Sequence, residues 1–143
     1  MCKVLPAVHA LTGCDATSEF GTKSAGVKAD PSMYLKDFGK LEGDVPETLC
    51  NAEKYLVQVL NRGNHGIKTL DNLRYNMYHQ QKSTTLLDLP PTSHAAKGHI
   101  LRAFYATHIQ INCLNNVSPD HLQYGFRMEE GNLEAVSFHR PIA

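Results

Sequence analysis

The feature that most constrains this chain is the spacing of apolar residues in segment 46–60. They recur at intervals of three and four, which places them on one face of a helix and the polar residues on the other. Pro46 suits the first turn, where its missing N–H costs nothing. The apolar face holds Leu49, Ala52, Leu56, Val59 and Leu60, and the polar face holds Asn51, Lys54 and Gln58. The spacing predicts a helix that must pack against other helices.

A longer helix is predicted to follow the rigid lead-in 89–93 and to reach about Asn112. Thr92 or Ser93 is expected to cap its first turn, since a hydroxyl accepts a hydrogen bond from a free backbone N–H there. The expected inward side holds Ile100, Leu101, Phe104, His108 and Ile111, and the outward side holds His99, Arg102, Ala106 and Gln110. His99 and Arg102 are therefore expected to share an exposed face. This face either contacts phosphate or a partner, or is an ordinary solvated helix face, and the second interpretation is favoured.

Shorter helices are predicted over residues 5–12, 23–29, 31–38 and 71–78, with Gly13, Pro31 and Gly39 at their limits. Asp71 is expected to cap or open the last of these. A small β-hairpin is predicted from 127–128 and 133–138, around the turn 130–132. The chain is thus expected to be mainly α, a single helical domain over 1–143. We expect residues 1–40 to form a helix–turn–helix segment, 41–115 a helical body, and 116–143 an irregular tail.

Composition excludes several classes of protein. The 14 Lys and Arg balance the 14 Asp and Glu, which argues against a strongly basic nucleic-acid binder. Residues 61–110 nevertheless carry six Lys or Arg against two Asp or Glu. No apolar run is long enough to cross a bilayer. No pair of the four cysteines has the C-x-x-C spacing of a zinc ribbon, and we expect an intracellular protein, with nucleus or cytoplasm left open.

Two motifs carry a resemblance to known proteins. The first is the apolar stretch LPAVHALTGCDATS over 5–18, and the second is the turn LPPT over 89–92 followed by His99 and the residues RAFY over 102–105. In this order they resemble a group of uncharacterised, transposon-associated animal proteins. The resemblance spans residues 4 to 126.

At a deeper level, residues 11–28 resemble part of the PIN-like, flap-endonuclease type of nuclease. There an apolar helix ends in Gly-x-Asp and leads into a helix–two-turn–helix with a glycine-rich turn and a lysine. The resemblance implies that Asp15 helps to hold a divalent ion such as Mg²⁺. It also implies that duplex DNA is held by its phosphates at the turn formed by Gly21, Thr22, Lys23 and Ser24, with Lys28 following.

The sequence departs from that family in two respects. Only Gly21 precedes Thr22 and Lys23, where the family has two glycines, and none of the fourteen residues before Asp15 is acidic. Two-ion phosphodiester hydrolysis needs several oxygen ligands, which Asp15 and Glu19 do not supply. We therefore expect no activity from the chain alone and no tightly bound metal. Asp15 also fits a loop aspartate that caps a turn, and Thr22 fits the N-cap of an ordinary helix.

Two functions remain open. The first is a fragment derived from a nuclease of transposon origin, which binds the DNA backbone weakly and depends on an upstream nuclease region or another protein. The second is a non-catalytic helical interaction module that uses the basic middle of the chain and the face formed by His99 and Arg102. A thiol nucleophile made from Cys14 and His9 is not favoured, because no third group orients the pair.

Overall fold

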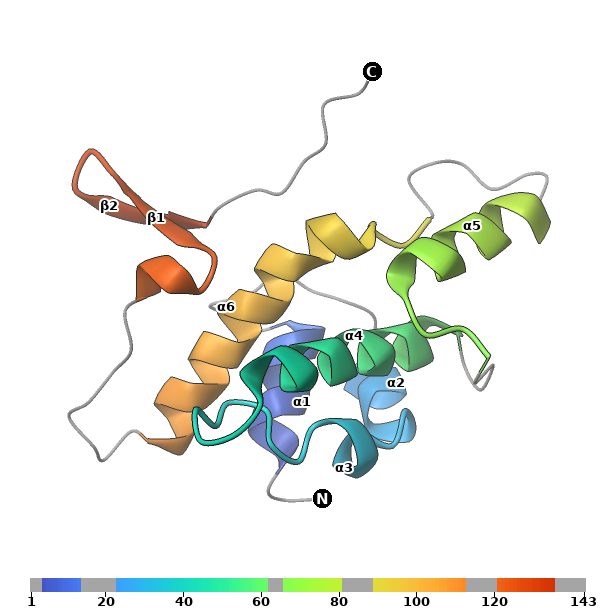
Figure 1. Cartoon of the computed structure of the whole chain (residues 1–143), viewed down its shortest axis with the longest axis horizontal. Helices are drawn as coiled ribbons and strands as arrows, with labels where there is room; N and C mark the ends of the chain where they lie inside the picture. The colour runs from blue at the N-terminus through green and yellow to red at the C-terminus, as the bar shows by residue number, and fades with distance from the viewer. Residues whose placement is uncertain (1–3, 14–22, 62–65, 81–88, 113–120, 136–143) are drawn as a thin grey trace.

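The computed structural model describes residues 4–13, 23–61, 66–80, 89–112 and 121–135. Within these ranges the chain is mainly helical, as predicted, and ends in a short antiparallel hairpin (Figure 1). The helices are α1 (Leu5–Thr12), α2 (Lys23–Lys28), α3 (Pro31–Tyr34), α4 (Val45–Asn61), α5 (Leu70–Gln80) and α6 (Ser93–Ile111). The 3-10 turn η3 (His121–Gln123) then leads into β1 (Phe126–Glu129) and β2 (Asn132–Ala135). None of the described helices has the length and apolar content needed to span a membrane.

The core lies where α6 packs against both α1 and α4 (Figure 1). Leu11 of α1, Leu56 of α4 and Phe104 of α6 are all completely buried there. The ring of Phe38 meets Phe104 edge-on, with centroids 5.3 Å apart. The apolar face predicted for α4 is confirmed by the burial of Ala52, Leu56 and Val59, whereas Gln58, placed on the polar face, is also buried.

The cap predicted for α6 is confirmed, because the Thr92 hydroxyl accepts a hydrogen bond from the backbone N–H of Ala95 at 3.0 Å. Helix α5 begins at Leu70, one residue before Asp71, which lies in its first turn. The Thr69 hydroxyl, rather than Asp71, accepts a hydrogen bond from the Asn72 N–H at 3.2 Å. The Asp71 carboxylate accepts the backbone N–H of Ser93 at 2.9 Å instead. The two helices therefore begin side by side, and a carboxylate of α5 caps the N-terminus of α6.

One predicted helix boundary is wrong, because helix α3 ends at Tyr34, four residues short of the predicted 38. Gly39, further along the chain, has a left-handed conformation with φ 89°. The Gly39 carbonyl accepts a hydrogen bond from Nδ1 of His108 at 2.7 Å, which confirms that His108 is a core histidine. In the hairpin, Glu130 and Gly131 both have positive φ, as a two-residue turn of type I′ requires. Residues 136–138 of the predicted second strand lie outside the described ranges.

Candidate functional site

The segment that the nuclease resemblance singles out is described only in part. Asp15, Gly21 and Thr22 lie outside the described residues, so the metal ligand and the start of the phosphate turn stay predictions. Lys23 and Ser24 form the first turn of α2, and nothing further is described of their side chains. Lys28 ends the helix and is exposed. What the structure adds is the way in which this short helix is attached to the domain.

Helix α2 is held on the core by a close approach at Gly26. A Cβ atom at this position would lie 2.8 Å from Cγ2 of Thr12 and 2.9 Å from the hydroxyl oxygen of Tyr55. The buried Tyr55 hydroxyl donates a hydrogen bond to the Gly26 carbonyl at 2.7 Å. Burial also raises the pKa of Tyr55 well above its ordinary value, which keeps the phenol protonated as a donor. Glycine is therefore needed here so that α2 can lie directly against α1 and α4.

The exposed face predicted for His99 and Arg102 is wrong. His99 is only 5% exposed, and its Nε2 lies 2.7 Å from the carbonyl oxygen of Leu11, to which it donates. Arg102 is half-buried, and its guanidinium donates to the Gly125 carbonyl at 3.2 Å. The reason is that α6 touches α1 as well as α4, so the buried arc of the helix is wider than one apolar stripe. His99 ties α6 to α1, and Arg102 ties α6 to the segment before the hairpin.

This burial changes the acid–base behaviour of His99. Removal from water lowers the pKa of its imidazole below the ordinary value, and the nearby positive charge of Arg102 lowers it further. The hydrogen bond to the Leu11 carbonyl acts in the opposite direction and does not overcome the burial. His99 is therefore held neutral at physiological pH, as a structural donor between α1 and α6.

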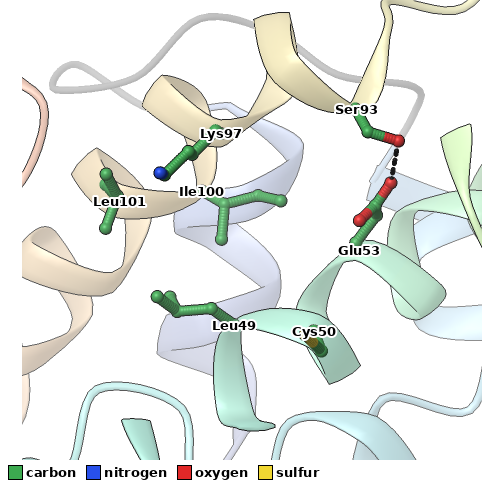
Figure 2. Close-up of a pocket in the computed structure, with 7 residues that line it drawn as sticks. All are labelled: Leu49, Cys50, Glu53, Ser93, Lys97, Ile100 and Leu101. Atoms are coloured by element: carbon green, nitrogen blue, oxygen red, sulfur yellow. Dashed lines mark hydrogen bonds between the residues drawn. The ribbon is translucent and has the colours of Figure 1, made fainter. Parts of the chain in front are cut away.

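A shallow groove lies between α4 and α6 (Figure 2). It encloses about 170 Å³, and most of its lining is apolar. The side chains around it belong to Leu49, Cys50, Glu53, Ser93, Lys97, Ile100 and Leu101. One carboxylate oxygen of Glu53 accepts hydrogen bonds from the Ser93 hydroxyl and from the Leu70 N–H, at 3.0 Å in the second case. Glu53 is thereby committed to joining the beginnings of α5 and α6.

The sequence did not predict the groove, although it predicted the apolar helix faces that form the groove walls. Leu49 and Leu101 were placed on apolar faces, and the structure shows both only half-buried because they flank the opening. Cys50 is a free, exposed thiol at its edge, and Figure 2 shows Lys97 on the opposite wall. Within the described part of the chain, no general base is hydrogen-bonded to this thiol, so the groove offers apolar contact and one cation, and no nucleophile–base pair.

In the described ranges, no three His, Cys, Asp or Glu side chains gather closely enough to hold a metal ion. No family model, curated protein or solved structure matches this chain. The described residues form a small helical domain with a short antiparallel hairpin.

Proposed function

We propose that this chain is the C-terminal helical region of a PIN-like, flap-nuclease-like protein of transposon origin. In this proposal it binds the DNA backbone weakly through residues 21–28 and does not hydrolyse DNA by itself. The order of features supports it, since an apolar helix ends before Gly13, Asp15 follows, and a short helix begins at Lys23. Contacts of this kind reach phosphate oxygens and carry no base information.

The observation that carries the proposal is the anchoring of α2 at Gly26. Because the helix is fixed between Thr12 and Tyr55, the exposed Lys28 is presented from a rigid base. Rigid presentation lowers the entropic cost of ordering a side chain on a phosphate. A short helix that carries lysines and is attached in this way is suited to contact a polyanion, even in a chain of zero net charge.

Hydrolysis needs more ligands than this segment supplies. Asp15 and Glu19 are the acidic residues among positions 1–28, and two carboxylates alone hold a divalent ion weakly. A two-ion site must also clamp both the attacking and the leaving oxygen. In this proposal, the remaining carboxylates and the tight binding of Mg²⁺ come from an upstream nuclease region or from another protein.

The test is a titration of labelled duplex DNA with the purified chain at low salt, followed by fluorescence anisotropy. Non-specific binding typically has a Kd of about 10⁻⁴ to 10⁻⁶ M at physiological salt, and we expect the weak end of that range. Lys23→Glu and Lys28→Glu should each weaken binding more than Lys40→Glu. Lys40 is a matched control because it is exposed and its partner Asp37, at 3.8 Å, is exposed too.

Equal loss from all three substitutions would mean diffuse charge attraction and would contradict the proposed turn. Binding that depends strongly on DNA sequence would also contradict it. The same preparations, incubated with duplex, flap and single-stranded DNA and Mg²⁺, are expected to show no cleavage. Cleavage that survives purification and disappears in Asp15→Ala would make the chain an enzyme.

The alternative proposal is a non-catalytic interaction module. The face formed by His99 and Arg102 no longer supports it, because both side chains are committed to contacts within the domain. The observation that now favours it is the apolar groove between α4 and α6, whose wall carries the exposed Lys97. Failure of DNA binding together with retained folding would leave this alternative as the better account.

A further inference from the structure

The terminal hairpin has two chemically different faces. Phe126 pairs with Ala135, and Met128 pairs with Leu133, so four apolar side chains lie on one face. The other face carries Arg127, Glu129, Asn132 and Glu134. Phe126 is half-buried, with its ring 5.9 Å from that of Tyr105, but Met128 and Leu133 are 51% and 49% exposed. The apolar face therefore begins on α6 and continues outward without cover in the described part of the chain.

The hairpin register also determines which backbone groups face outward. The residues that flank a two-residue turn exchange two hydrogen bonds, and such pairs alternate with pairs that exchange none. Glu129 with Asn132 and Arg127 with Glu134 are thus the bonded pairs. The N–H and C=O groups of Leu133 and Ala135 consequently point away from β1, along the outer edge of β2.

The two edges of this hairpin differ in access. The start of β1 lies against η3, which precedes it in the chain (Figure 1). All four residues of β2 are exposed, and β2 pairs only with β1 within the described residues. An unpaired strand edge is a template for another strand, because its backbone groups match those of an extended chain. The edge available for pairing is therefore that of β2.

We propose that this edge docks a second copy of the same chain, by antiparallel pairing of the two β2 strands about Leu133. In this register the Leu133 residues of the two copies face each other as a hydrogen-bonded pair. Asn132 of each copy then faces Glu134 of the other, so that an amide donor meets a carboxylate twice. No like charges are directly opposite each other. Both copies contribute the same residues to the contact, as twofold symmetry requires.

The product is a four-stranded sheet in which Met128 and Leu133 of both copies form one continuous apolar face. An isolated two-stranded hairpin is marginal in water, whereas three or more strands with an apolar face are stable. Antiparallel pairing about Leu133 joins only residues 132–134 of the two β2 strands. This contact buries less than the roughly 1,000 Å² expected of a stable interface, so the dimer is weak and depends on concentration. This inference does not rest on the proposed DNA binding, which involves α2.

Sedimentation velocity of the full chain over a wide concentration range tests the proposal. The wild type should shift from monomer toward dimer as concentration rises. Leu133→Lys should abolish the shift, because two lysines would then face each other on the symmetry axis. Met128→Lys makes the same change on the same face of the hairpin but away from the axis, and it should leave most of the shift. Asn132→Lys should strengthen association, by placing a cation opposite each Glu134, and added salt should reverse this gain.

Amide hydrogen exchange followed by NMR gives an independent readout. The amide of Leu133 should gain protection as concentration rises, while those of Asn132 and Glu134 should be protected at every concentration. A chain that stays monomeric throughout overturns the proposal. So does a dimer that Leu133→Lys and Met128→Lys weaken equally, since that result would mean that the apolar face is covered without strand pairing. Circular dichroism of each variant checks that the helical domain is still folded.

Discussion

Replacing Gly39 with alanine should destabilise the domain through two separable costs. The residue has φ 89°, and a side chain in this left-handed region costs about 1–2 kcal/mol. A Cβ atom would also lie 2.6 Å from Cγ2 of Thr107 and 3.2 Å from the backbone nitrogen of His108. Overpacking of this kind typically costs about 1–3 kcal/mol. The sum is about 2–5 kcal/mol, which corresponds to a fall in Tm of roughly 4–20 °C for a chain of this size.

The chain offers a matched control at Gly131. Its φ is 81°, close to that of Gly39, but a Cβ atom there would have no neighbour within 4 Å. Gly131→Ala should therefore cost only the backbone strain, about 1–2 kcal/mol or less, because the hairpin lies at the edge of the domain. The difference between the two variants isolates the steric contact with Thr107.

Thermal unfolding by circular dichroism and urea titration measure both variants. Thr107→Ser removes Cγ2 but keeps the hydroxyl that donates to the Ala103 carbonyl at 2.8 Å. Combined with Gly39→Ala, it should recover part of the lost stability, as a positive coupling in a double-mutant cycle. Equal melting of Gly39→Ala and Gly131→Ala, with no recovery by Thr107→Ser, would refute the proposed packing of Gly39 against α6.

Two further predictions concern the buried face of α6. Phe104→Ala should lower the unfolding free energy by about 3–5 kcal/mol, since Phe104 is fully buried. Ile109→Ala, on the exposed side of α6, should change it little. Similar melting temperatures for the two variants would mean that α6 buries a different face. Because the pKa of His99 is lowered in the folded state, its contribution to stability is present above about pH 6.5 and is lost as the pH falls through the folded pKa. His99→Gln should reduce this acid sensitivity in urea titrations at several pH values, and an unchanged pH profile would contradict the assignment.

Local signals in the sequence identified most of the helices. The spacing in 46–60, the hydroxyl at Thr92 and the glycine at 131 each act within a few residues of where they stand. The structure confirms α4, the start of α6 and the hairpin turn accordingly. The candidate metal and phosphate residues were reached through resemblance, and Asp15, Gly21 and Thr22 lie outside the described ranges.

The residues that the sequence pattern misplaced lie on helices that pack against more than one neighbouring helix. On α6, the periodicity indicated a single apolar stripe, and His99 was predicted to face outward because it lies outside this stripe. The helix is wedged between α1 and α4, so His99 faces the Leu11 carbonyl and is stabilised there by a hydrogen bond rather than by water. Gln58 on α4 is buried in the same way, on the face that was expected to be polar.

The sequence by itself determined where the helices begin and which residues favour a core, because helical periodicity and capping depend on neighbours within about four positions. Only the tertiary structure decided how many sides of each helix are covered. It also decided that Gly26 and Gly39 are points of close approach, that Glu53 and Asp71 join helix beginnings, and that β2 pairs only with β1 among the described residues. These features depend on contacts between segments far apart in the chain, and no local pattern specifies which segments meet.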